Sequence, residues 1–173
     1  KYLFKTKENI WSIGGKIDGL FINDNNEKVV YNKLDKLTEI NKSLKDIVKE
    51  LKKDPPDLVG LYTISYNYPV IEVLSKGIRE AVPDLKIVAG GPHVTFMSEE
   101  TLRETPIDFC CLGEAEESLH ELIQHLEDGS KDFSGIEGLA YKTAEGEIIK
   151  NSERVRIKDL DELPLPARDL FPM

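Results

Sequence analysis

The chain has 173 residues, of which 40% are hydrophobic, and 32 acidic residues against 23 basic ones give a formal net charge of -9. This length fits one domain with an extension, and the acidic balance without a long basic block argues against a nucleic-acid partner. No apolar run approaches the roughly 20 residues that span a bilayer and no signal-peptide pattern opens the chain, so we expect a cytoplasmic protein with no membrane partner.

The first 38 residues give a weaker pattern than the rest of the chain. Residues 2–4 form a short apolar run that could be a first strand. Residues 10–21 predict a helix interrupted by the pair Gly14-Gly15, and residues 28–31 predict a second strand.

Three short apolar runs are the clearest strand signals. They cover residues 57–62, 85–89 and 107–112. The first follows the turn residues Asp54-Pro55-Pro56, and the other two end at glycine. Short apolar runs with such boundaries are typical of strands buried on both faces.

Helical periodicity fills the segments between these strands. Apolar side chains recur every three to four positions, which places one stripe of each helix against a sheet. A shorter helix is expected to begin near Ser98, a suitable N-cap, and to end near Arg103. The three longer stripes are Ile40, Leu44, Ile47, Val48 and Leu51; Val70, Leu74, Ile78 and Ala81; and Leu119, Leu122, Ile123 and Leu126.

Alternating strands and helices predict an α/β fold with a doubly wound, mostly parallel five-stranded sheet of the flavodoxin-like type. Residues 135–158 alternate around Glu145-Gly146, which predicts a small C-terminal β-hairpin extension. The expected organisation is therefore an α/β domain over 1–134, the hairpin over 135–158 and a proline-rich linker over 159–173.

The loops after the strands are the predicted ligand site, because the crevice of an open parallel sheet lies outside the carboxyl ends of its strands. These loops cover residues 65–68, 90–95 and 113–117. The glycine pair of the second loop could approach a ligand closely or turn amide groups toward an anion, although a plain turn also explains it. A lone His93 could contact a phosphate or a flat ligand, or simply form surface hydrogen bonds.

Other polar residues at these loops have structural explanations. Glu114 stands near the start of a helix, where the helix dipole stabilises a carboxylate. Cys110 and Cys111 are adjacent on a predicted strand and are interpreted as reduced, buried thiols. We predict no catalytic residue and no metal ligand, because nucleotide-binding, hydrolase and cysteine-cluster motifs are absent.

The order of several motifs resembles the N-terminal cobalamin-binding domain of B12-dependent radical SAM enzymes, which include methyltransferases and anaerobic magnesium-protoporphyrin ester cyclases. The resemblance covers roughly Pro55 to Met173. It rests on Gly90-Gly91-Pro92-His93, then Gly113-Glu114-Ala115-Glu116, then Leu160-Asp161-Glu162-Leu163-Pro164-Leu165-Pro166-Ala167-Arg168-Asp169. The last motif resembles the linker to a radical SAM barrel that holds an iron–sulfur cluster and S-adenosylmethionine.

This resemblance implies that the chain binds cobalamin and presents it to a radical SAM barrel of the same polypeptide, for methyl transfer or a related radical reaction. The 4Fe-4S cluster and S-adenosylmethionine would belong to that barrel, so the chain would not be catalytic alone. Tyr62 stands where other such domains carry a serine, and no Asp-x-His-x-x-Gly motif supplies an axial imidazole. The expected cofactor-binding residues are Tyr62, Thr63, Ser65, Gly90, Gly91, His93, Thr95, Gly113 and Glu114.

Two other functions fit the same pattern. The chain could keep this fold without cobalamin and act as a substrate-binding or docking module. It could also be a flavodoxin-like FMN carrier, although no phosphate loop rich in Ser and Thr follows the first predicted strand.

Overall fold

The computed structural model describes residues 10–13, 19–22, 28–31, 37–159, 161 and 163, and side chains from residue 44 onward except residue 50. The predicted strand at residues 2–4 and most of the predicted linker lie outside the described residues. The elements are β1 (Ile10–Ile13), β2 (Gly19–Ile22), β3 (Lys28–Tyr31), α1 (Leu37–Lys53), β4 (Leu58–Tyr62), α2 (Tyr68–Ala81), β5 (Lys86–Gly90), α3 (Pro92–Glu104), β6 (Phe109–Cys111), α4 (Glu116–Glu127), β7 (Leu139–Lys142) and β8 (Ile148–Lys150).

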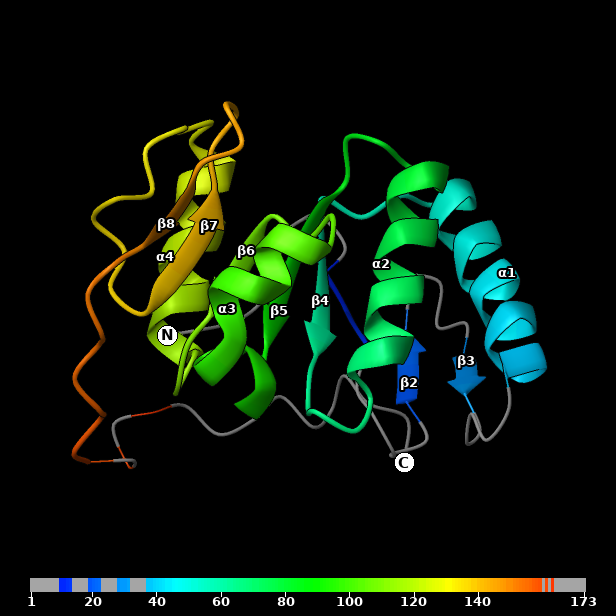
Figure 1. Cartoon of the computed structure of the whole chain (residues 1–173), viewed down its shortest axis with the longest axis horizontal. Coiled ribbons are helices and arrows are strands. Elements are labelled where there is room, and N and C mark those ends of the chain that lie inside the picture. The colour runs from blue at the N-terminus through cyan, green and yellow to red at the C-terminus, as the bar shows by residue number, and fades with distance from the viewer. Residues whose placement is uncertain are drawn as a thin grey trace.

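One mixed sheet organises the chain, with the strand order β1-β4-β5-β6-β7-β8. Strands β1, β4, β5 and β6 are parallel to one another, while β7 is antiparallel to β6 and β8 is antiparallel to β7. The predicted α/β class and the C-terminal hairpin are therefore confirmed. The sheet has six strands rather than the predicted five: β1, where a helix was predicted, joins β4, β5 and β6, and the hairpin is hydrogen-bonded directly to β6 and continues the sheet (Figure 1).

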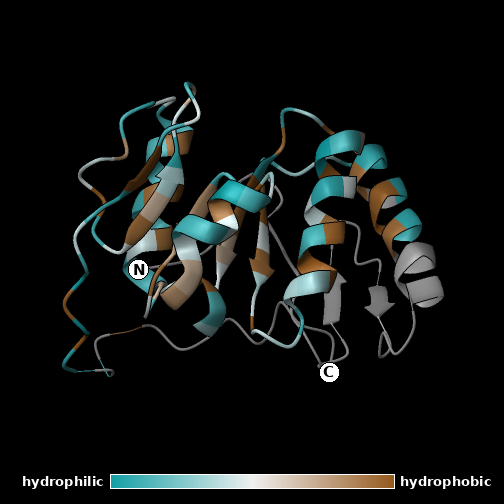
Figure 2. Cartoon of the chain, viewed as in Figure 1, coloured by the Kyte–Doolittle hydropathy of each residue, from teal (hydrophilic) through white to brown (hydrophobic). Residues whose placement is uncertain are grey.

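Each face of the sheet has its own apolar core, because successive residues of a strand point to opposite faces. On β5, Ile87 and Ala89 pack with α2 and α3, whereas Val88 packs on the side of α4. On β6, Cys110 joins the first core and Cys111 the second. Helices α2, α3 and α4 carry both hydrophilic and hydrophobic residues (Figure 2).

The helix after β5 is longer than predicted. It begins at Pro92 with Gly91 as its N-cap, and its backbone is non-helical at Met97. Two helical segments therefore meet at this kink: the second, over residues 98–104, matches the helix predicted to begin near Ser98, whereas the segment that begins at Pro92 was not predicted. Proline at the first helical position favours this earlier start, since it lacks only an amide hydrogen that would have no partner inside the helix. His93 and Thr95 consequently lie in the first turn of α3 and not in a loop.

The predicted helix over residues 10–21 is wrong. The described parts of that segment are two strands, β1 and β2, and β1 pairs in parallel with β4. Isoleucine, tryptophan and phenylalanine favour strands, and a glycine pair disfavours a continuous helix. The predicted strand at residues 28–31 is confirmed as β3, which pairs antiparallel with β2 in a separate two-stranded sheet.

Candidate binding site at the carboxyl edge of the sheet

The chain changes faces of the sheet between β5 and β6. Strand β5 leads into α3, which packs in the core of one face, and β6 leads into α4, which packs in the core of the other. The two connections diverge at the carboxyl ends of neighbouring parallel strands. Such a divergence leaves a crevice where open α/β sheets bind ligands.

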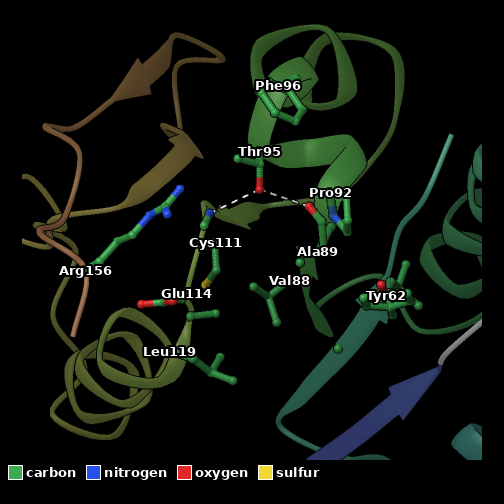
Figure 3. Close-up of a pocket in the computed structure, with 16 residues that line it drawn as sticks. Tyr62, Val88, Ala89, Pro92, Thr95, Phe96, Cys111, Glu114, Leu119 and Arg156 are labelled. Carbon is green, nitrogen blue, oxygen red and sulfur yellow. Dashed lines mark hydrogen bonds between the residues drawn. The ribbon is translucent and has the colours of Figure 1, made fainter. Parts of the chain in front are cut away.

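A cavity of about 700 Å³ occupies this position (Figure 3). Its lining is apolar apart from a few polar side chains. The residues that line it are Gly60, Leu61, Tyr62, Val88, Ala89, Gly90, Gly91, Pro92, Thr95, Phe96, Cys111, Gly113, Glu114, Ala115, Leu119 and Arg156.

Glycines form part of the cavity floor. The register of β4 and β5 places Gly60 beside Val88 and Tyr62 beside Gly90. By strand alternation these four residues share the face of the sheet on which α4 packs. A Cβ added to Gly90 would meet no atom within 4 Å. The absence of a side chain at Gly90 therefore keeps space open that a ligand could fill.

The loops after β4 and β5 are joined at Gly91. Its φ of +103° is unfavourable for other residues, and a Cβ there would lie 2.6 Å from the carbonyl oxygen of Thr63 and 2.9 Å from the ring of Tyr62. The His93 amide donates a hydrogen bond to the same Thr63 oxygen over 3.2 Å. Only glycine permits this close approach, which fixes the Tyr62 ring at the cavity wall.

Thr95 joins the loop after β5 to the loop after β6. Its hydroxyl donates to the carbonyl oxygen of Gly91 over 3.1 Å and accepts from the amide of Gly113, also over 3.1 Å. Figure 3 shows both bonds at the edge of the cavity. One side chain thus connects two of the predicted site loops.

The structure divides the nine predicted site residues into two groups. Six of them line the cavity: Tyr62, Gly90, Gly91, Thr95, Gly113 and Glu114. Thr63, Ser65 and His93 do not line it. Thr63 is fully buried, and His93 stacks on the ring of Tyr68 at 4.1 Å and is hydrogen-bonded through Nδ1 to Ser65 Oγ at 3.2 Å. These contacts hold the loop after β4 against the start of α3.

Sequence reasoning missed two exposed residues of the cavity. Phe96 is 83% exposed although it lies on a helix, and its aromatic character beside the Gly-Gly-Pro sequence was the available signal. Arg156 comes from the segment that follows β8, and no sequence motif marks it. That segment, residues 151–157, is called the strap below.

Arg154 attaches the strap to α4. Its guanidinium donates to Glu117, Glu121 and the Ser118 hydroxyl, and to the carbonyl oxygen of Glu137. Partial burial alone would lower the pKa of Arg154, but its hydrogen bonds with Glu121 and Glu117 outweigh burial and raise it. The amide of Ile157 donates to the Glu114 carboxylate over 3.3 Å.

The two cysteines are free and buried, as predicted. Burial raises the pKa of both thiols, and the pKa of Cys111 reaches about 12. Cys111 is therefore a neutral thiol at the cavity floor near neutral pH. Among the described residues, no group of three or more His, Cys, Asp or Glu side chains could hold a metal ion, and no helix there has the length and apolar character to cross a bilayer.

Known proteins are similar to this chain in sequence over most of its length. The family described as B12 binding domain matches residues 29–123, which is more than half of the chain. An uncharacterized methyltransferase of Pyrococcus horikoshii is 40% identical over 132 residues, 74% of this chain and 28% of that protein. The anaerobic magnesium-protoporphyrin IX monomethyl ester cyclase of Rubrivivax gelatinosus is 32% identical over 111 residues, 62% of this chain and 20% of the enzyme.

Solved structures share the fold. The radical S-adenosylmethionine methyltransferase TsrM from Kitasatospora setae, with cobalamin and a [4Fe-4S] cluster bound, has a TM-score of 0.58 and 23% identity over 69% of this chain and 22% of its own. The cobalamin-dependent S-adenosylmethionine radical enzyme OxsB, with aqua-cobalamin and S-adenosylmethionine bound, has a TM-score of 0.56. It is 22% identical to this chain, and the match covers 77% of this chain and 18% of OxsB. The chain thus spans less than a third of the proteins it matches.

Proposed function

The chain belongs to the B12-binding domain family, and on that premise we propose that it holds cobalamin in the cavity at the carboxyl ends of β4, β5 and β6. The observation that carries this proposal is the open space above Gly90, where an added Cβ would have no neighbour within 4 Å. Unlike the exposed Gly135, which has similar free space, Gly90 lines a cavity at the carboxyl edge of the sheet, where open α/β folds bind ligands.

The lining fits the nucleotide tail of cobalamin, which carries a flat base, a ribose and a phosphate. Val88 and Leu119 give an apolar surface for the base, and Gly60 and Gly90 let it approach the sheet closely. Tyr62, 43% exposed, offers an aromatic face beside Gly90. The fit is thus one of shape and apolar surface.

Within this proposal the residues of the chain bind and orient the cofactor. Bound cobalamin would supply a cobalt centre that carries a methyl group or supports a radical step. None of the described residues that line the cavity is a histidine, so we propose that the cobalt receives no imidazole ligand from this cavity. The predicted site residues Thr63, Ser65 and His93 would act indirectly, by fixing the loop that carries Tyr62.

We further propose that the chain works as one module of a larger radical SAM enzyme. The support is the length of the relatives, which exceed this chain several-fold, and the motif at residues 160–169 that resembles a linker to the barrel. In this arrangement the iron–sulfur cluster and S-adenosylmethionine belong to the barrel. The domain over residues 1–134 would then carry the cofactor site, and the hairpin over 135–158 would support it. The linker over 159–173 would connect both to the barrel.

Titration with hydroxocobalamin tests the proposal. We expect a change in the visible spectrum and cobalamin that stays with the protein through desalting. Gly90→Ala and Gly90→Val should weaken binding progressively with little effect on the urea midpoint, because their side chains enter the open space. Gly135→Ala is the matched control, since that exposed glycine also has free space around its Cβ position and does not line the cavity.

Two results would contradict the proposal. One is wild-type protein that retains no cobalamin and gives no spectral change. The other is wild-type binding that survives unchanged in Gly90→Val, which would place the cofactor elsewhere. A yellow protein that retains FMN instead would favour the flavodoxin-like alternative.

A further inference from the structure

The cavity has one cationic side chain, that of Arg156, among the described residues that line it. The only carboxylate in the same lining is Glu114, which already accepts the amide of Ile157. Arg156 forms no hydrogen bond or ion pair with another residue of the described chain. Figure 3 shows it across the cavity from Tyr62. A free guanidinium at a cavity wall is a site for an anionic group of the ligand.

Several amide groups at this edge that could donate to an anion already have partners. At the start of α3, Pro92 has no amide hydrogen and the amides of His93 and Thr95 donate to Thr63 and Gly91 carbonyl oxygens. The amide of Gly113 donates to Thr95. The first turn of α4 carries Glu116 and Glu117, whose charges repel an anion. Arg156 is the one positively charged group of the described lining that could neutralise a phosphate.

The strap fixes Arg156 from both sides. Two residues before it, Arg154 is tied to Glu117 and Glu121 on α4. One residue after it, the amide of Ile157 is bonded to Glu114. The backbone at Arg156 is thus held at the cavity before any ligand arrives, which reduces the ordering cost of binding.

We infer that Arg156 binds the phosphate of the nucleotide tail of cobalamin. This inference rests on the proposed function and adds a residue that distinguishes ligands with a phosphate from those without one. The planar guanidinium can donate two parallel N–H bonds to phosphate oxygens, which a single neutral donor cannot do. The formal net charge of -9 disfavours a phosphate near the chain, and a local cation at the cavity wall offsets this repulsion.

The test compares cobalamin with cobinamide, which has the same corrin ring but lacks the nucleotide and its phosphate. Affinities for the aquo forms of both are measured with wild type, Arg156→Gln and the control Arg103→Gln. Arg103 is an exposed arginine in the last turn of α3 and does not line the cavity. Urea midpoints establish that all three proteins are folded.

We expect Arg156→Gln to weaken cobalamin binding about tenfold, the loss of one charge-assisted contact, and to leave cobinamide binding unchanged. The salt dependence of cobalamin binding should also become shallower in this variant. Arg103→Gln should match the wild type with both ligands.

The failures are distinguishable. If wild type binds cobalamin and Arg156→Gln binds it equally well, the role of Arg156 is wrong while the proposed function stands. Equal weakening toward both ligands would overturn the phosphate contact and assign Arg156 to the corrin. If wild type binds neither ligand, the proposed function and this inference both fall.

Discussion

Thr63 donates two hydrogen bonds to the carbonyl oxygen of Gly90, one from its amide over 2.7 Å and one from its hydroxyl over 2.8 Å. Thr63 is fully buried and follows β4 directly, while Gly90 is the last residue of β5. The pair extends the parallel pairing of the two strands by one residue into the loops. The cavity wall at Tyr62 depends on this connection.

Thr63→Val should lower the free energy of unfolding by about 1 kcal/mol, because it removes the hydroxyl bond but keeps the shape of the side chain and the amide bond. Urea denaturation measures the change. A small loss of cobalamin affinity should accompany it, since the loop that carries Tyr62 becomes less restrained. An unchanged urea midpoint would show that the hydroxyl bond contributes nothing to stability.

Gly91→Ala should destabilise the protein by roughly 1–3 kcal/mol, since the added Cβ would contact a backbone oxygen and the φ of +103° disfavours alanine. Gly135→Ala, where the Cβ meets nothing within 4 Å, should stay within about 0.5 kcal/mol of wild type. Both are measured by urea denaturation. Equal midpoints for the two variants would refute the close contact of Gly91 with Thr63.

Arg154→Lys should lower the free energy of unfolding by about 1 kcal/mol, because an ammonium group cannot reach both carboxylates and the backbone oxygen as a guanidinium does. It should also weaken cobalamin binding a few-fold by loosening the strap. In an Arg156→Gln background the affinity should fall no further, since the residue it positions is gone.

Lys76→Met is the control for Arg154→Lys. Lys76 forms an exposed ion pair with Glu72 on α2, remote in sequence from the strap. Its substitution should change neither stability nor affinity appreciably. Additive losses from Arg154→Lys and Arg156→Gln would show that Arg154 does not act through Arg156.

Stability should fall with rising pH because of the thiol of Cys111. In the unfolded chain this thiol has a pKa of 9.0, whereas burial raises it to about 12 in the folded protein. Between these two pH values the thiol is ionised in the unfolded chain but still protonated in the folded protein, which favours unfolding. The contribution of Cys111 to stability is therefore complete below pH 9 and is lost toward pH 12.

Urea midpoints at pH 8, 9 and 10 measure this dependence. The slope from this group is at most about 1.4 kcal/mol per pH unit, and Cys111→Ala should show a correspondingly flatter decline above pH 9. Parallel curves for wild type and variant would mean that the thiol is not buried as described.

The sequence predicted the fold best where a short apolar run has clear boundaries. The apolar runs at residues 57–62, 85–89 and 107–112 predicted β4, β5 and β6 because each is short and is bounded by proline or glycine, as buried strands are. It was misleading at residues 10–21, where short apolar segments satisfy helix and strand periods equally well. After β5, Ser98 predicted the helical segment that follows the kink at Met97, but the earlier segment, which Pro92 after Gly91 signalled, was missed.

By itself, the sequence determined the parallel α/β framework and the edge of the sheet at which a ligand site forms, because hydrophobic periodicity and glycine positions are local properties. Only the tertiary structure decided which residues face the cavity. Thr63, Ser65 and His93 were expected at the ligand but bond to neighbouring loops, and Arg156 reaches the cavity from a segment more than 60 residues away from Gly90. Such convergence depends on packing between elements distant in the chain, which no local pattern encodes.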